Sequence, residues 1–154
     1  MKTLVIGLGN PLLRDDSVGL RVAQQLRPLL AGYSDIEIVE DYRGGLRLME
    51  RMVDFDRAIV IDAICTGAKP GTIHLLSPDD IPTQHSASAH DVNLPTALKF
   101  GRTSGAHLPT NEAIILVGIE AADIQTFDDE KLTPEVEAGV SLAIEAVLSA
   151  LNPK

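Results

Sequence analysis

Tryptophan is absent from this sequence of 154 residues, and aromatic residues of all kinds make up only 3% of it. Basic residues are also few, with 13 Lys and Arg against 22 Asp and Glu and a formal net charge of -9. Nucleic-acid-binding proteins neutralise phosphates with Lys and Arg and commonly stack bases on aromatic rings. The composition therefore argues against a nucleic acid as the partner.

Cysteine occurs once, at Cys65, so no disulfide can form within the chain. The sequence also lacks an apolar run long enough to span a bilayer. The short apolar run in MKTLVIGLGN leads into NPLLRDD, which has no small-residue cleavage site for a signal peptidase. We therefore expect a cytoplasmic protein that forms one domain over residues 1–154 and has no membrane partner.

Five short runs rich in β-branched residues are candidate strands. Three of them are apolar throughout, which is typical of parallel strands covered on both faces. Another alternates apolar and polar residues, and the last follows a Lys-Pro-Gly turn. The five runs are Leu4–Ile6, Ile36–Val39, Ala58–Ile61, Gly71–Leu76 and Ala113–Val117.

Apolar residues at helical spacing lie between and after these runs. They occur in residues 18–30, 46–53, 94–98 and 136–151. Thr133 and Pro134 suit the cap and first position of the last helix, and Gly101 is placed to cap the end of the third. Because strands and helices alternate, we predict a three-layer α/β/α sandwich with a mostly parallel central sheet of about five strands.

Acidic residues follow two of the predicted strands. Asp15 and Asp16 come after the first strand, and Asp62 comes directly after Ala58–Ile61. Ligands of open α/β sheets bind beyond the carboxyl ends of the strands, where these carboxylates should meet. For Asp62, the residues alone leave a structural role and a functional role equally open, and its place after four apolar residues favours function.

The stretch GLGNPL resembles a phosphate-binding loop but has Leu12 in place of the third glycine. Asp15 and Asp16 would also place negative charge where a pyrophosphate should sit. We therefore interpret the glycines as a sharp turn that delivers the aspartates. One aspartate suffices to cap a helix, so we assign capping to Asp15 and a position in the cleft to Asp16.

Four histidines offer a possible metal ligand. His74 lies in a candidate strand and His107 in a polar loop, whereas His85 and His90 share the loop TQHSASAHD before a helix. His90, nearest to the helix, completes a set of two carboxylates and one imidazole that suits zinc or nickel. No local metal-binding motif such as H-E-x-x-H supports this set, so spacing alone leaves it open.

Nucleophilic catalysis is poorly supported by the sequence. No G-x-S-x-G elbow accompanies Ser86 or Ser88, and a triad cannot be inferred from serines beside histidines. Cys65 follows Asp62 by three residues, but a lone cysteine is more often a small tolerated residue than a nucleophile.

Together these residues resemble the hydrogenase maturation endopeptidases, which process the large subunits of nickel-iron hydrogenases. The resemblance runs in family order and covers nearly the whole chain. It is carried by GLGNPLLRDDSVG, VIDAICTGAKPGTI, SAHDVNL and VGIEAADIQTFDDEKLTPEVEAGV. It implies that Asp16, Asp62 and His90 are the metal ligands and catalytic residues.

The resemblance also implies an unusual metal. Nickel already installed in the large-subunit precursor would be recognised before a C-terminal extension is removed, with zinc or cadmium as substitutes in vitro. The metal, or a water bound to it, would then activate the scissile peptide, or Asp16 would act as a general base on water.

One segment departs from the family pattern. Many members have an acid, two glycines and a threonine after the second strand, whereas this chain has EDYRGGLRLME. Glu40 or Asp41 is the equivalent acid, and Tyr42 and Arg43 are candidate partner contacts that would set specificity.

Two other functions are compatible with parts of the sequence. A docking or chaperone module for a nickel-bearing partner would need the same three ligands without cutting. The opening LVIGLGNP also resembles peptidyl-tRNA hydrolase, but that family's catalytic stretch is replaced by RDDSVG, and a pI near 4.7 does not suit its substrate. The sequence does not indicate an oligomeric state.

Overall fold

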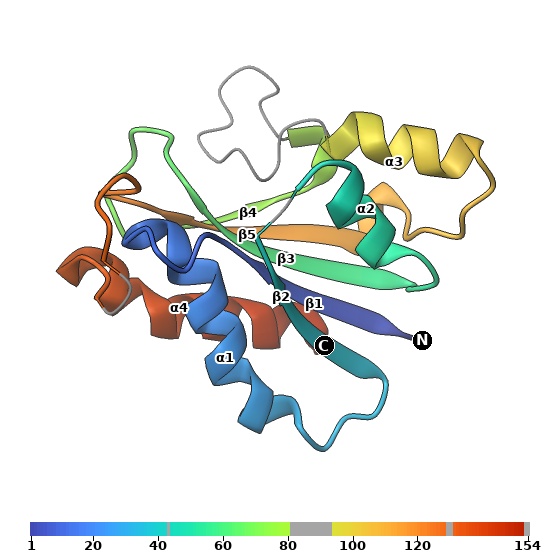
Figure 1. The fold of residues 1–154 in the computed structure, drawn as a ribbon. Helices are drawn as coiled ribbons and strands as arrows, with labels where there is room; N and C mark the ends of the chain where they lie inside the picture. Colours follow the sequence, from blue (N-terminus) through green and yellow to red (C-terminus); the bar gives the residue numbers. More distant parts are fainter. Residues whose placement is uncertain (43, 81–93, 129–130, 153–154) are drawn as a thin grey trace.

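The computed structural model describes residues 1–42, 44–80, 94–128 and 131–152. Within these residues, five strands form one sheet in the order β2-β1-β3-β5-β4 (Figure 1). Neighbouring strands are parallel except β4, which runs antiparallel to β5. The strands are β1 (Thr3–Leu8), β2 (Ile36–Asp41), β3 (Arg57–Ile64), β4 (Ile73–Leu76) and β5 (Ile114–Glu120).

In the described part of the chain, four α-helices cover the two faces of the sheet. They are α1 (Val18–Leu30), α2 (Leu46–Met52), α3 (Leu94–Thr103) and α4 (Pro134–Leu151). Helices α1 and α4 lie together on one face, and α2 and α3 lie together on the other (Figure 1). The predicted three-layer sandwich with a mostly parallel sheet is confirmed, and the antiparallel strand is the edge strand β4.

The helices and the sheet pack together through two apolar cores, one on each face of the sheet. Alternate residues of the central strands supply each core: Val60 of β3 faces α2 and α3, whereas Ile59 and Ile61 face α1 and α4. Both faces of β1 and β3 are therefore buried, which explains why the runs Leu4–Ile6 and Ala58–Ile61 within them are apolar throughout.

The prediction that Gly101 caps the end of α3 is wrong. The helix continues to Thr103, and Gly101 lies within its last turn. A Cβ atom at Gly101 would lie 2.7 Å from the sulfur of Met49 and 2.8 Å from a methyl carbon of Leu108. Glycine at this position lets α3 pack closely against the Met49 and Leu108 side chains, which would have to shift to admit a Cβ atom, and local sequence does not reveal this contact.

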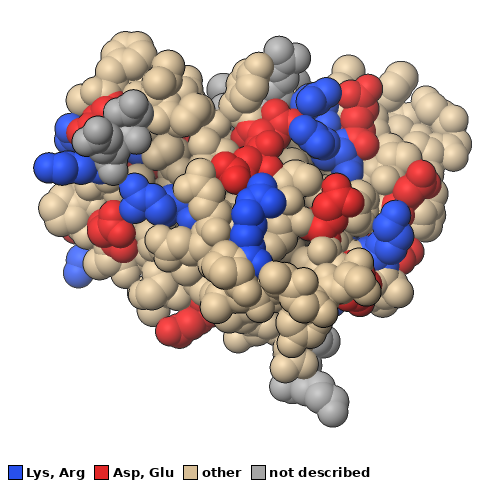
Figure 2. All heavy atoms as spheres, turned by 60° about the horizontal axis from the view of Figure 1, so that its bottom comes forward, with Lys and Arg blue, Asp and Glu red and all other residues tan. Residues whose placement is uncertain are grey.

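Charged side chains of both signs are interspersed over the face that carries α1 and α4 (Figure 2). Arg21 of α1 pairs with Glu137 of α4 at 2.9 Å, and Arg27 pairs with Glu40 at 3.1 Å. This face therefore presents mixed charge rather than a basic patch for a polyanion. None of the helices in the described ranges combines the length and apolar character needed to cross a bilayer.

Candidate active site

The glycine turn after β1 folds the chain back onto the end of its own strand. Gly9 has φ of +156°, and a Cβ atom there would lie 2.2 Å from the backbone oxygen of Asp16. The next residue, Asn10, donates its backbone N–H to Oδ2 of Asp16 at 3.0 Å. The glycines form the sharp turn that the sequence predicted, and the turn also hydrogen-bonds the carboxylate of Asp16, which was not predicted.

Asp16 and Asp62 are both buried, with 6% and 0% of their surfaces exposed. Asp16 lies in the short 3-10 helix η1 (Asp15–Ser17), which packs against β3. Asp62 lies in β3, and its Oδ1 accepts the backbone N–H of Ala63 at 2.8 Å. The strand continues two residues beyond Asp62 to Ile64, further than the apolar run predicted, because Ala63 and Ile64 still pair with β5.

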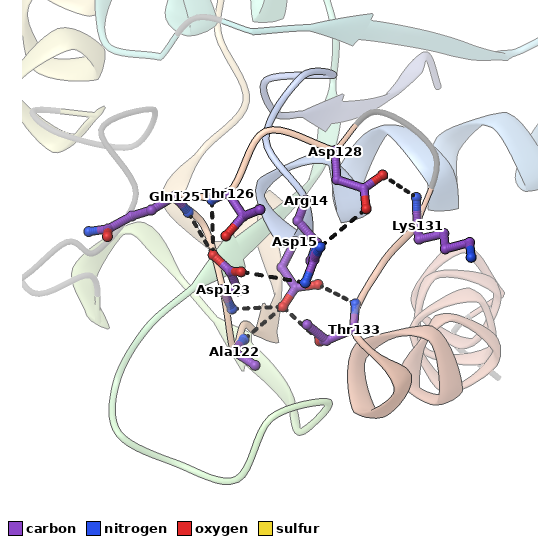
Figure 3. Close-up of polar contacts among 9 residues, drawn as sticks. All are labelled: Arg14, Asp15, Ala122, Asp123, Gln125, Thr126, Asp128, Lys131 and Thr133. Atoms are coloured by element: carbon purple, nitrogen blue, oxygen red, sulfur yellow. Dashed lines mark hydrogen bonds and ion pairs between the residues drawn. The ribbon is translucent and has the colours of Figure 1, made fainter.

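Asp15 does not cap the helix that follows it, so that prediction is wrong. The N-cap of α1 is Ser17, which makes no side-chain cap hydrogen bond. The buried carboxylate of Asp15 instead accepts the backbone N–H groups of Ala122, Asp123 and Thr133, and also the Thr133 hydroxyl, all at 2.8–2.9 Å (Figure 3). Asp15 thereby joins the turn after β1 to the loop after β5 and to the start of α4.

A further buried acid, Glu120, lies at the end of β5. Its Oε2 accepts the backbone N–H groups of Thr66 and Gly67, and its Oε1 accepts the Thr66 hydroxyl at 2.6 Å. Nε2 of His74 lies 3.1 Å from the same Oε1. Glu120 was not predicted from the sequence as a site residue, although it follows the apolar residues of its strand as Asp62 does. This carboxylate orders the loop between β3 and β4.

Asp41 ends β2 and is the buried acid of the EDYRGG segment, whereas Glu40 turns outward to Arg27. Oδ2 of Asp41 accepts hydrogen bonds from Nε of Arg47 at 3.2 Å and from Nε of Arg51 at 3.0 Å. Burial by itself raises the pKa of Asp41, but hydrogen bonds from the Tyr42 backbone and the two guanidinium groups outweigh it. The pKa is therefore lowered, and the carboxylate stays ionised and paired.

Cys65 lies near all of the central acids. Burial raises the pKa of its thiol, and the negative charges of Glu120, Asp16, Asp15 and Asp62 raise it further. The thiol therefore stays protonated at neutral pH, which disfavours a nucleophilic role. Asp16 and Asp62 are 46 residues apart in sequence, and the packing of η1 against β3 brings their segments to the same edge of the sheet.

The third predicted ligand, His90, lies outside the described residues, as does His85. His74 contacts Glu120, and the exposed His107 has its Nε2 3.4 Å from Asp56. Among the residues that the structure describes, no group of three His, Cys, Asp or Glu side chains could hold a metal ion. The structure thus brings two of the three predicted site residues, Asp16 and Asp62, to the edge of the sheet at the carboxyl ends of β1 and β3.

The sequence of this chain matches a known protein family and several of its members. The family model described as hydrogenase maturation protease matches residues 20–150. The hydrogenase 2 maturation protease of Escherichia coli K12 is 33% identical over 99% of this chain and 92% of its own length. A putative hydrogenase maturation protease of Methanocaldococcus jannaschii is 30% identical, covering 97% of this chain and 96% of its own.

Solved structures agree with these sequence matches. The hydrogenase maturating endopeptidase HybD of E. coli superposes with a TM-score of 0.80 at 30% identity, covering 99% of this chain and 93% of that one. The [NiFe] hydrogenase maturation protease HybD of Thermococcus kodakarensis gives a TM-score of 0.74 at 28% identity, covering 97% and 98%. The chain therefore belongs to the hydrogenase maturation protease family, and its activity is that of an endopeptidase.

Proposed function

We propose that this protease removes the C-terminal extension of a nickel-iron hydrogenase large-subunit precursor after nickel has been inserted, and that it recognises the bound nickel. Its relatives support the class of substrate: the E. coli protein is named for hydrogenase 2, and the T. kodakarensis protein for a [NiFe] hydrogenase. The nickel is part of the substrate in this proposal and not a resident cofactor of the protease.

The observation that carries the proposal is the pair of buried carboxylates at one sheet edge. Asp16 arrives on the turn after β1 and Asp62 on the neighbouring strand β3. Burying two anions in one locality is costly, and a divalent cation offsets that cost by binding them. Carboxylate oxygens together with one imidazole, that of His90, make a donor set suited to nickel or zinc. Three protein ligands leave coordination positions for groups of the precursor.

The hydrolysis adds the oxygen of one water to the scissile carbonyl carbon and transfers a proton to the departing amine. Asp16 can serve this reaction as a nickel ligand or as the base that takes the proton from water. An Asp16→Asn variant separates the two roles. If the variant loses cleavage but still binds the nickel-loaded precursor normally, Asp16 is the base. If it loses both cleavage and binding, Asp16 is a nickel ligand.

The loop after β2 supplies a contact for the precursor in this proposal. Tyr42 is exposed, and its backbone N–H is held by Oδ1 of Asp41 at 2.8 Å. Because Arg47 and Arg51 pair with Asp41, this acid serves as the anchor of the loop rather than as a nickel ligand. Arg43, the other predicted contact, lies outside the described residues.

The test is cleavage of a nickel-loaded large-subunit precursor beside a nickel-free control, with the products weighed by intact mass spectrometry. We expect loss of one C-terminal peptide in the nickel-loaded sample only. Equal cleavage of both samples would refute nickel recognition. Metal-dependent binding with no change in mass would instead favour the docking or chaperone module.

A further inference from the structure

Strand β4 is an edge of the sheet, and its pairing with β5 begins at a β-bulge (Figure 1). Gly71, which has φ of +88°, donates its backbone N–H to the oxygen of Glu120 at 2.8 Å. Glu120 in turn donates its backbone N–H to the oxygen of Thr72 at 2.9 Å. A glycine with positive φ and this exchange of hydrogen bonds form a bulge that fixes where the pairing of the two strands starts.

The backbone groups of β4 point alternately toward β5 and away from it. Counted in steps of two from Thr72, His74 and Leu76 direct their N–H and C=O groups toward β5. Ile73 and Leu75 therefore direct theirs outward, and no described residue makes a backbone hydrogen bond with them on that side. Such a row of outward donors and acceptors is a template for one more strand.

A groove of about 470 Å³ lies between β4 and α4. Two of the side chains that line it are strongly exposed, Leu75 at 60% and Leu142 at 53%. Ile73, Ala146 and Ser149 also line it. Exposed apolar residues are common one at a time, but these share one groove. Ile73 and Leu75 supply both groove wall and outward backbone groups, so an added strand can seat alternate side chains beside them.

Close packing holds α4 against the start of β4, so the groove is preformed. A Cβ atom at Gly139 would lie 2.8 Å from the Gly71 oxygen, and one at Gly71 would lie 2.4 Å from the Glu135 oxygen. A second groove of about 370 Å³, which Lys69, Gly71 and Leu142 help to line, continues the first toward the loop between β3 and β4. A preformed groove reduces the cost of ordering the protein when a partner binds.

The outer side of β4 is in register with the candidate active site. Asp62 of β3 and His74 of β4 both pair with Gly118 of β5, so the three residues form one row across the sheet. Neighbouring strands lie about 4.8 Å apart, so a strand added to β4 would run about 14 Å from β3. An extended chain advances about 3.3 Å per residue, and about five residues therefore span the distance to Asp62.

We propose that the C-terminal extension of the precursor binds as an added strand along the outer side of β4, with apolar side chains seated in the groove beside Leu75 and Leu142. This inference rests on the proposed function, since the extension is the occupant. A chain end suits the position because it can lie extended without turning back into a folded domain. Because β4 starts at the edge where β5 ends, an extension that leaves Asp16 and Asp62 would run parallel to β4.

The first test alters the strand edge and the groove separately. Leu75→Pro removes an outward N–H but keeps the inward bonds of His74 and Leu76, since proline is tolerated on an edge strand when its nitrogen faces outward. Leu142→Ser removes apolar groove wall, and Leu29→Ser, on α1 at 54% exposure, is its matched control. We expect KM for the nickel-loaded precursor to rise about 10-fold or more in Leu75→Pro and Leu142→Ser, with kcat close to wild type and no change in Leu29→Ser.

The second test measures strand addition directly. Backbone amide exchange of the wild-type protein is followed by NMR while a synthetic peptide with the sequence of the extension is added up to its solubility limit. We expect the outward amides of Ile73 and Leu75 to exchange at least about 10-fold more slowly with the peptide than without it. Leu142→Ser should show less of this protection than Leu29→Ser at equal peptide concentration.

An unchanged KM in Leu142→Ser, an equal rise in Leu29→Ser, or unchanged exchange at Ile73 and Leu75 would overturn the proposal. If Leu75→Pro does not fold, Leu142→Ser and the exchange measurement decide. Protection that appears without peptide and grows with protein concentration would identify a second copy of the chain as the occupant and refute the proposal. Failure of the proposed function shows differently, since the wild-type protein would cleave no precursor, and the peptide titration still decides strand addition.

Discussion

Asp15 accepts hydrogen bonds from both the backbone N–H and the hydroxyl of Thr133, each at 2.8 Å, although 118 residues separate them. Thr133 is the N-cap of α4, yet its hydroxyl makes no cap bond within that helix. The interaction ties the start of α4 to η1, in which Asp16 lies. A fully buried carboxylate thus positions the neighbouring residue of the candidate active site.

Replacing Asp15 by Ala should destabilise the protein strongly. Three backbone N–H groups and one hydroxyl would lose their acceptor in a buried setting, so we expect the free energy of unfolding to fall by about 3 kcal/mol or more. Urea denaturation measures the change. Asp128→Ala, which removes a partly exposed partner of Arg14, should cost less than about 1 kcal/mol. Similar losses in the two variants would contradict this account of Asp15.

Gly19→Ala should disrupt the packing of α1 on the sheet. A Cβ atom at Gly19 would lie 2.3 Å from the Ile61 oxygen and 2.4 Å from the Leu8 oxygen, and both are backbone atoms of central strands. We expect a loss of about 2–3 kcal/mol in stability, together with lower cleavage because α1 starts two residues after Asp16.

Gly32 provides the matched control for this glycine. A Cβ atom there has no heavy atom within 4 Å, so Gly32→Ala should be neutral or stabilise the protein by up to about 1 kcal/mol. Thermal melts of both variants decide the matter. Equal melting temperatures would show that the close approach of Gly19 to the strands does not limit stability.

Asp62→Asn should abolish cleavage while leaving the fold intact. The amide oxygen of Asn can still accept the Ala63 N–H, but the negative charge required to bind a cation is lost. We expect cleavage of the nickel-loaded precursor to fall at least about 100-fold, as measured by mass spectrometry. Asp54→Asn, at an exposed residue with φ of +71°, should retain full activity. Substantial activity in Asp62→Asn would remove Asp62 from the proposed site.

Asp41 should make stability depend on acidic pH. Its pKa in the folded protein is lowered below the ordinary value of 3.8, so the unfolded chain binds a proton more readily. The stabilisation is present above pH 3.8 and is lost as the pH falls through the folded pKa. At neutral pH we expect Asp41→Asn to cost about 1–2 kcal/mol, after allowance for the partly exposed arginines.

The stability difference between wild type and Asp41→Asn should therefore shrink as the pH falls below 3.8. Urea denaturation at a series of pH values measures it. Glu37→Gln, at an exposed position of the same strand, should show no such trend. A constant difference down to the most acidic pH would mean that the two arginines do not stabilise the ionised carboxylate.

The positions of strands and helices were predictable from sequence because they follow from local patterns. Continuous β-branched runs predicted the buried strands, and apolar residues at helical spacing predicted the four α-helices of the described residues. Local patterns do not define ends well, since pairing with a neighbour extends β3 beyond Asp62 to Ile64. The close packing at Gly101 was likewise not predictable from the local sequence, because it depends on Met49 and Leu108, which belong to other segments.

By itself, the sequence determined the family and the alternating architecture, and it identified Asp16 and Asp62 as acids that follow two of the predicted strands. Only the tertiary structure decided what each buried acid binds. Asp15 was expected to cap its own helix and instead holds Thr133, while Glu120 was not singled out and holds Thr66. The physical reason is that a buried carboxylate is stabilised by whatever donors the fold brings to it, and these donors lie 118 and 54 residues away.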